Sequence, residues 1–170
     1  MDETQERFEQ AVGDQFIDWL NTTSGFKYTF KGRGNTAPDL IYSDGQSELG
    51  IEITSAYYDS DHAKMQWQLA RKIPDAPTTW SGMNFDERLA KNIESKISEK
   101  CINDYGPNSV LIVFVRADLT FHNELVDLLN GIHLPTSIPF SAIYLLGLFP
   151  VSSDCPSGYQ VIPIKVPANS

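Results

Sequence analysis

Two carboxylates flank a short hairpin pattern in the first third of the chain. Asp39 precedes an apolar segment at 40–42, and Glu52 lies inside a second one, between two isoleucines. The Asp44-Gly45 turn between these segments predicts an antiparallel hairpin, which would bring the two carboxylates together. A buried carboxylate needs a partner or a metal ion, and Mg²⁺ commonly takes one or two carboxylates plus water and phosphate oxygens. The pair therefore predicts a divalent metal site. The alternative is that Asp39 caps a turn and Glu52 lies on a solvated face.

The spacing of these residues resembles a known signature. Pro38-Asp39-Leu40 is followed by Glu52-Ile53-Thr54, with twelve residues between the two acids. This pattern is similar to that of the PD-(D/E)XK nuclease superfamily, whose Asp and Glu bind one or two divalent metal ions. The resemblance implies Mg²⁺ or Mn²⁺ held by Asp39, Glu52 and the carbonyl of Ile53. In that family a lysine two residues after the Glu assists the attacking water, and here Thr54 occupies that place.

A predicted helix at about 84–104 offers two lysines in place of the missing one. On a helical wheel that starts at Phe85, Lys96 lies at about 20° and Lys100 at about 60°, both inside the apolar arc. Lys91 lies at about 240°, on the opposite side. A lysine on a core-facing stripe is costly unless it meets a carboxylate, although its stem can be buried while the ammonium reaches water. Because the family sometimes moves its catalytic lysine to this helix, the resemblance implies Lys96 or Lys100.

The first predicted helix, at 5–20, carries a similar anomaly. Glu9 falls on the stripe formed by Phe8, Val12 and the later apolar residues, close to Gly13, which would permit close packing. Relatives in the PD-(D/E)XK superfamily often contribute an acidic residue from this helix, so the resemblance makes Glu9 a candidate metal ligand. A salt bridge from Glu9 to one of the two lysines is the structural alternative.

Three further residues are candidates for substrate binding. Gln66 and Arg71 lie on a predicted helix at 61–72, where members of the family often place polar groups near the phosphate. Tyr57 follows the strand that contains Glu52 and could stack on a base or line the cleft. A solvated helix face and ordinary packing are the respective alternatives.

The predicted elements describe an α/β protein. A helix is followed by a three-strand meander, a helical region, a buried strand, a short helix, a second buried strand and an edge strand. A meander followed by a βα crossover implies a mixed sheet with helices on both faces. The order also resembles the restriction-endonuclease-like αβββαβ core of the family. The predicted strands are 26–31, 40–42, 49–55, 110–115, 142–148 and 159–166, and the short helix is 123–130.

Composition limits the classes of function. The 170 residues fit one domain, 1–170, and no apolar run is long enough to span a membrane, so we expect a cytoplasmic protein. A net charge of −9 disfavours a general nucleic-acid binder. However, ten of the thirteen basic residues lie within 27–100, the segment that contains the motif. Local binding of phosphate is therefore permitted.

These patterns predict a metal-dependent nuclease that hydrolyses phosphodiester bonds, with DNA as the expected substrate by resemblance. The acidic surface and small size suggest that a protein partner or a second copy of the chain assists in targeting. Because Thr54 replaces the lysine of the motif, the alternative is a catalytically inactive member of the same fold that serves as a binding or interaction module.

Overall fold

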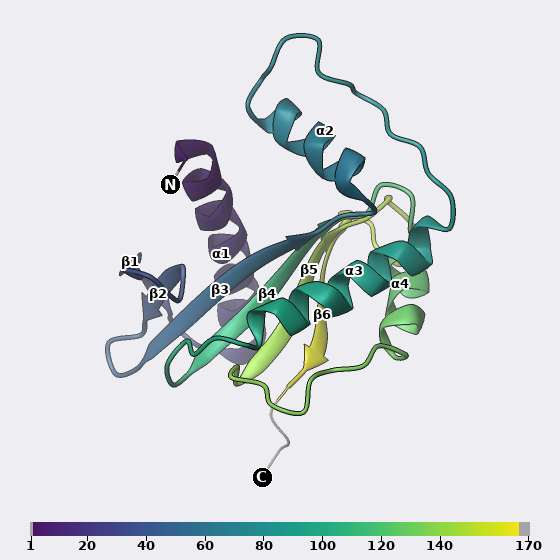
Figure 1. The fold of residues 1–170 in the computed structure, drawn as a ribbon. Helices are drawn as coiled ribbons and strands as arrows, with labels where there is room; N and C mark the ends of the chain where they lie inside the picture. Colours follow the sequence, from purple (N-terminus) through teal and green to yellow (C-terminus); the bar gives the residue numbers. More distant parts are fainter. Residues whose placement is uncertain (1, 167–170) are drawn as a thin grey trace.

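A computed structural model describes residues 2–166, which form six strands and four helices (Figure 1). The strands make one mixed sheet, and their spatial order, β1-β2-β3-β4-β5-β6, is also their order in the chain. The sequence prediction of an α/β protein with a mixed central sheet flanked by helices is confirmed. The strands are β1 (Thr29–Arg33), β2 (Leu40–Ser43), β3 (Glu48–Ala56), β4 (Ser109–Arg116), β5 (Ala142–Leu148) and β6 (Tyr159–Lys165), and the helices are α1 (Glu3–Ser24), α2 (Ser60–Ala70), α3 (Phe85–Lys100) and α4 (His122–Leu129).

Strand direction divides the sheet into three parts. β1, β2 and β3 form the predicted antiparallel meander, β3, β4 and β5 run parallel, and β6 pairs antiparallel with β5 at the edge. The alternation of side chains along β3 assigns its residues to two faces. Ile51 and Ile53 pack in the core under α1, whereas Glu52 and Thr54 point to the face that α3 covers. Pro163 lies in β6, where a missing N–H is tolerated because the strand is at an edge.

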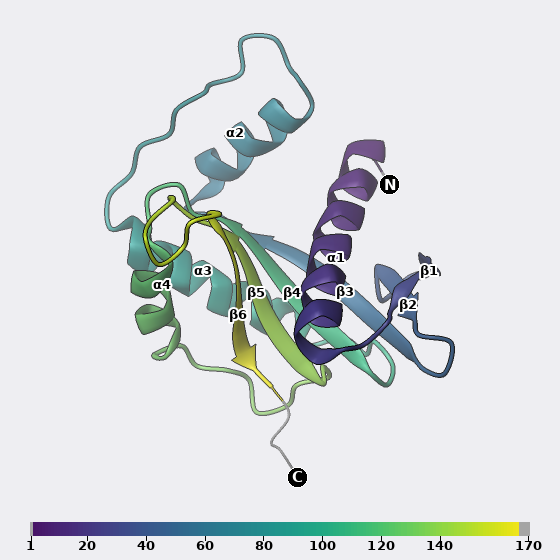
Figure 2. The ribbon, with the colours of Figure 1, turned by 180° about the vertical axis from the view of Figure 1, so that it is seen from behind.

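Helices cover both faces of the sheet. Figures 1 and 2 show α1 across one face and α3 with α4 across the other. Val12, Phe16 and Ile17 bury the apolar stripe of α1 against the strands. The helix begins at a cap in which the Asp2 carboxylate accepts the N–H of Thr4 at 2.9 Å. It ends at Gly25, whose φ of 72° is the left-handed conformation that favours glycine at this position.

α2 and the segment that follows it project beyond the carboxyl-terminal ends of the parallel strands (Figure 1). An aromatic contact fixes the far end of that segment. The ring of Trp80 stacks on Tyr58 with a centroid separation of 4.9 Å and an angle of 8°, and its Nε1–H donates to Asp59 at 2.9 Å. The far part of the segment 71–84 is therefore attached to the residues that follow β3.

The boundaries of two predicted elements needed correction. The predicted long helix, 84–104, ends at Lys100, because the residues beyond it form a turn stabilised by Asn103 N–H donating to the Lys100 carbonyl. The first predicted strand, 26–31, is shifted to Thr29–Arg33, because Asn21 of α1 both donates to and accepts from the backbone of Tyr28. This shift places Arg33 inside the strand.

Candidate functional site

The candidate site begins where β3 extends past its neighbour β2. Pairing between the two strands starts at Ser43 with Glu48 and ends at Leu40 with Ile51, although β3 continues to Ala56. Asp39 takes over at this point: its Oδ2 accepts the N–H of Ile53 at 2.8 Å. The carboxylate of Asp39 therefore replaces a strand partner and lies beside Glu52.

Packing around Pro38 fixes this position of Asp39. A Cβ added to Gly34 would lie 1.9 Å from the Pro38 carbonyl oxygen, and one added to Gly50 would lie 2.6 Å from the Pro38 ring. Both contacts are closer than any side chain allows, so both positions require glycine. The loop between β1 and β2 can thus fold tightly onto β3 and present Asp39 to its open edge.

Glu52 is a buried carboxylate with one oxygen satisfied. It is 5 % exposed, and its Oε1 accepts a hydrogen bond from Lys100 Nζ at 2.5 Å. Within the described part of the chain, Oε2 is buried and has no hydrogen-bond partner. An unpaired buried oxygen on a charged group is costly, and such exceptions usually mark a functional position.

The electrostatics of the cluster show that its acids repel one another. The pKa of Asp39 is raised to about 6, chiefly by burial and then by the nearby charges of Glu52 and Glu9, against the lowering effects of the Ile53 N–H and of Lys100. Burial acts to lower the pKa of Lys100, but the hydrogen bond and charge of Glu52 outweigh it and raise that pKa. Lys100 therefore remains an ammonium, and the cluster still carries excess negative charge.

Glu9 reaches the same region from α1 and is fully paired. It is 5 % exposed, its Oε2 accepts from Arg33 at 2.9 Å, and its Oε1 accepts from Gln5 at 3.0 Å. Arg33 also donates to the Glu6 carbonyl at 2.5 Å. The alternative of a salt bridge from Glu9 to a lysine of α3 was wrong, because Arg33 is the partner. A role for Glu9 as a metal ligand stays a prediction.

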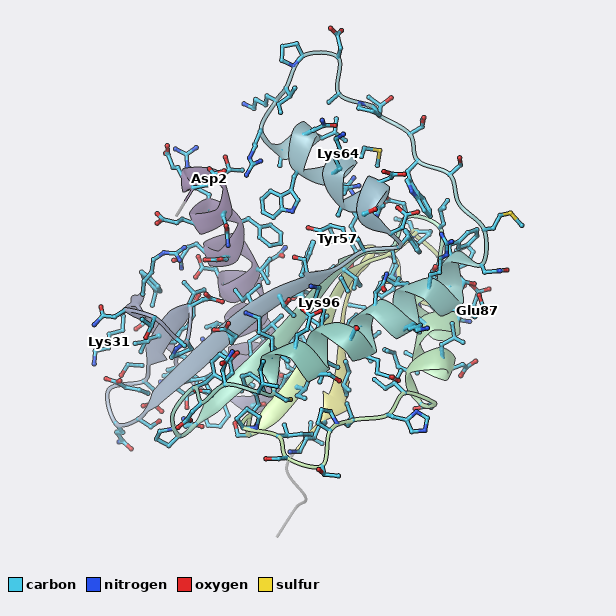
Figure 3. The ribbon with its side chains drawn as sticks, viewed as in Figure 1. Asp2, Lys31, Tyr57, Lys64, Glu87 and Lys96 are labelled. Carbon is cyan, nitrogen blue, oxygen red and sulfur yellow. The ribbon has the colours of Figure 1, made fainter. Side chains whose placement is uncertain are left out.

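The two lysines predicted on α3 separate. Lys100 joins the carboxylates, whereas Lys96 pairs with Glu99 at 2.8 Å and is 38 % exposed. The two lysines are one helical turn apart. Only the last turn of α3 lies level with Glu52, so only Lys100 reaches this glutamate. Figure 3 labels Lys96 on α3 and Tyr57 past the end of β3, below α2.

Two cavities lie beside the cluster, and neither Asp39 nor Glu52 is among the residues that border them. A cavity of about 230 Å³ is bordered by Glu9, Lys100 and Thr54, and also by Trp67 of α2. A larger cavity of about 640 Å³ adjoins it, shares Thr54 as a wall, and extends along α3 to Lys96. Thr54, which stands in place of the lysine, therefore borders both cavities, and the smaller cavity meets the cluster through Lys100.

The candidates for substrate binding take different positions. Tyr57 borders both of these cavities, and burial raises its pKa, so its hydroxyl keeps its proton. Gln66 lies 3.3 Å from the imidazole of His62 and points into a separate apolar cavity. Arg71 turns toward the start of α1, where it donates to Asp2 at 2.7 Å. Of the three, Tyr57 is nearest in position to the carboxylates.

The residues present fit a divalent cation in part. Within residues 2–166, no three His, Cys, Asp or Glu side chains are arranged to hold a metal ion. Asp39 and Glu52 nevertheless supply two carboxylates that repel each other, and one oxygen of Glu52 lacks a partner. The N–H and C=O of a strand residue point to the same side, so the Ile53 carbonyl also faces the open edge of β3. Two carboxylates and a carbonyl, completed by water, suit Mg²⁺ or Mn²⁺.

Arg33 is the residue of this region that the sequence did not reveal. Its neighbours, Gly32 and Gly34, gave a pattern too short to indicate a phosphate-binding loop. The available signal was an arginine two residues after a predicted strand, in a chain whose preceding helix carries a glutamate on its apolar stripe.

Comparison of the chain with protein families, with curated proteins and with solved structures finds no match. Within the described residues, no helix is both long and apolar enough to cross a membrane.

Proposed function

We propose that this protein is a metal-dependent nuclease of the PD-(D/E)XK class, which hydrolyses phosphodiester bonds in DNA. The observation that carries the proposal is the convergence of Asp39, Glu52 and Lys100. These residues come from a loop, a strand and a helix that are distant in sequence, and each was predicted from its sequence pattern. A chance match to a short motif does not require a lysine from α3 to reach the motif glutamate.

The arrangement of elements supports the same class. α1, the meander β1–β3, α3 and the parallel strand β4 follow one another in the order of an αβββαβ core. The motif aspartate precedes β2 and the motif glutamate lies in β3, as the resemblance requires. β5 and β6 extend the sheet beyond β4, and α4 packs beside α3.

The chemistry follows from the polar groups of the cluster. Asp39, Glu52 and the Ile53 carbonyl would hold Mg²⁺ or Mn²⁺, which when bound lowers the pKa of water and neutralises charge on the phosphate. The ammonium of Lys100 holds Glu52 in place and offers a fixed positive charge to the negative charge that develops during hydrolysis. Thr54 supplies a hydroxyl that can donate to a phosphate oxygen from the motif position.

The charges around the cavities are less negative than those of the whole protein, which supports an anionic polymer as substrate. Five basic and three acidic residues border three adjoining cavities: the one beside the cluster, the larger one along α3, and a third between α1, α2 and the residues after α2. Asp39 and Glu52 add two acidic groups, so the charges of this region balance, although the whole protein carries a net charge of −9. Basic groups that line a cleft contribute most of the affinity for a phosphate backbone. The basic residues are Lys64, Arg71, Arg88, Lys96 and Lys100, and the acidic residues are Glu9, Asp59 and Glu99. The acidic remainder of the surface is consistent with targeting by a protein partner or a second copy of the chain.

An inactive binding module is the second candidate, and one observation favours it. In the structure, Lys100 occupies an oxygen of Glu52 that a metal ion could use, and Thr54 does not replace its charge. If this ion pair persists in the presence of metal and DNA, the fold would bind without cutting.

Cleavage assays with a matched variant separate the two candidates. The protein and its Glu52→Ala variant would be incubated with plasmid, linear and single-stranded DNA and with RNA, in Mg²⁺ or Mn²⁺. We expect metal-dependent cleavage that the substitution abolishes, together with Mn²⁺ binding measured by calorimetry. Absence of both cleavage and Mn²⁺ binding would contradict the nuclease and leave the binding module.

A further inference from the structure

A second, mainly apolar cavity lies directly beside the candidate site. It has a volume of about 380 Å³ and is enclosed by α1, α2 and the carboxyl-terminal ends of β4 and β5. Phe8, Tyr57 and Trp67 border it and also border the cavity that contains Glu9 and Lys100. The same three aromatic side chains therefore lie between this mainly apolar cavity and the cavity that Glu9 and Lys100 border.

Aromatic rings dominate the walls of this cavity. Phe8 makes edge-to-face contacts with Trp67 at 5.7 Å and with Phe114 at 5.0 Å. The guanidinium of Arg71 lies 5.6 Å from the centre of the Trp67 ring. These mutual contacts hold the rings in fixed orientations, so a planar ligand would find preformed surfaces for stacking.

Three polar side chains are also among the residues that border the cavity. Gln66 carries an amide with both donor and acceptor capacity, Tyr57 a protonated hydroxyl, and Arg116 a guanidinium with several donors. Apolar walls with a few polar groups form the usual pattern of a site for a flat heterocycle. The neighbouring cluster, in turn, suits a phosphodiester.

We propose that this cavity binds an unpaired nucleobase of the strand whose phosphate lies at the Asp39–Glu52 cluster. The proposal rests on the nuclease function proposed above and adds a substrate class to it. Three features carry it: aromatic walls for stacking, polar groups in the walls for the base edge, and walls shared with the cavity that Glu9 and Lys100 border. A base and the phosphate attached to its sugar would occupy the two cavities on either side of Trp67.

This arrangement selects for unpaired DNA. A base in a duplex is stacked and paired, and it would have to leave the helix to enter the cavity. Single strands, overhangs and flaps present such a base without that cost. The preferred substrate is therefore a single-stranded segment, with a blunt duplex bound more weakly.

Three probes test the cavity by binding alone, in EDTA so that no strand is cut. They are a labelled single-stranded oligodeoxynucleotide, a strand of the same length built from abasic sugar–phosphate units, and the blunt duplex. The variant is Trp67→Leu, which keeps an apolar side chain but removes the ring. Trp19→Leu is the matched control, because Trp19 is also partly buried but packs against Phe16 and Tyr144 instead.

We expect the unmodified protein to bind the base-bearing strand about tenfold or more tightly than the abasic strand, measured by fluorescence anisotropy. Trp67→Leu should remove most of this difference by weakening binding to the base-bearing strand, with its affinity for the abasic strand almost unchanged. Trp19→Leu should leave both affinities unchanged. Equal binding of the two strands by the unmodified protein, or an equal loss for both in Trp67→Leu, would overturn the proposal.

Cleavage measured on the same probes distinguishes this proposal from the nuclease function. Base-dependent binding without cleavage in Mg²⁺ or Mn²⁺ would support the base cavity and contradict the enzyme. Cleavage that proceeds equally on single strands and blunt duplex, and that Trp67→Leu does not change, would support the enzyme and overturn the base cavity. A change of oligomeric state in Trp67→Leu, with no effect on DNA, would show that a second copy of the chain covers the cavity and would also overturn the proposal.

Discussion

Two buried acid–base pairs lie within the same region, and their contrast explains the site. The Glu9–Arg33 and Glu52–Lys100 pairs have almost the same burial: each glutamate side chain is 6 % exposed, and the cations are 27 % and 29 % exposed. In the first pair, Arg33 and Gln5 satisfy both oxygens of the glutamate. In the second, one oxygen of Glu52 has a partner and the other, within the described residues, has none.

This difference separates a structural pair from a reactive one. Glu9 and Arg33 join α1 to β1, and each oxygen of the carboxylate already has a hydrogen-bond partner. Glu52 keeps a free oxygen next to Asp39, whose pKa is raised to about 6 chiefly by burial. A buried polar network that is half satisfied costs stability, and such a cost is expected where a ligand completes the network.

The largest expected effect comes from exchanging one glutamate at a time for glutamine. Glu52→Gln should lower the rate of DNA cleavage by at least about 1000-fold, because it removes a charged metal ligand. Glu9→Gln is the matched control and should lower it by less than about tenfold, since it acts through the position of Arg33. Initial rates in Mg²⁺ or Mn²⁺ measure both. Equal losses would mean that the two pairs have the same role.

Substitution of the two lysines of α3, and transfer of the charge to residue 54, test whether cleavage needs the charge of Lys100. Lys100→Met should reduce cleavage by about 100-fold, while Lys96→Met, one turn away on the same helix, should leave it nearly unchanged. Thr54→Lys introduced into Lys100→Met should recover part of the loss, because residue 54 lies on the same strand face as Glu52. A failure of the double variant to exceed Lys100→Met would argue against charge as the function of Lys100.

For the free energy of unfolding, we expect the larger effect from Glu9→Gln and the smaller one from Glu52→Gln. Glu9→Gln should lower the free energy of unfolding by about 1–3 kcal/mol, because Arg33 loses a charged hydrogen-bond partner. Glu52→Gln should change it by less than about 1 kcal/mol, because the lost ion pair is offset by relief of the repulsion with Asp39. Urea unfolding without metal measures both. A larger loss in Glu52→Gln would contradict the division into structural and reactive pairs.

The smallest effect is a pH dependence that arises from Asp39. Its pKa is raised in the folded protein from 3.8 to about 6, so the folded state binds the proton more tightly than the unfolded state. The stability gained from this proton is fully present below pH 4 and is lost as the pH rises through about 6. We expect a loss of about 1–2 kcal/mol over this range in the metal-free protein, since partial exposure screens the charges.

Asp39→Asn supplies the control for the pH dependence. Urea unfolding at several pH values should show that the decline between pH 4 and 6 is reduced in this variant, and that added Mn²⁺ stabilises the unmodified protein but not the variant. An unchanged pH profile in Asp39→Asn would assign the effect to another group.

The sequence predicted the mixed α/β sheet and the approach of Asp39, Glu52 and a lysine of α3 because both depend on local patterns. Alternation placed Glu52 on one face of β3, the Asp44-Gly45 turn set the hairpin, and helical spacing placed Lys100 on the core side of α3. Each of these patterns involves only residues that are close together in the sequence, and the folded protein has the elements that they predict. The choice between Lys96 and Lys100 could not be made, because a helical wheel gives the direction of a side chain but not its height along the sheet.

Other features depend on contacts between distant segments. Arg33 pairs with Glu9 because β1 starts three residues later than its pattern indicated and lies beside α1, which no local pattern encodes. Arg71 turns to Asp2 for the same kind of reason. The apolar cavity combines residues such as Phe8, Trp67 and Phe114 from three elements, and each of them alone resembles ordinary core.

The strand order of the sheet bears on how the chain folds. Because β1 to β6 are arranged in space as in the sequence, each strand needs only the preceding one as a template, and the sheet can grow one strand at a time during synthesis. The growing edge is an apolar strand when β4 or β5 is the latest addition. Growth ends at β6, where Pro163 removes a donor from the edge. We therefore expect the nascent chain to be most prone to aggregation between synthesis of β4 and of β6.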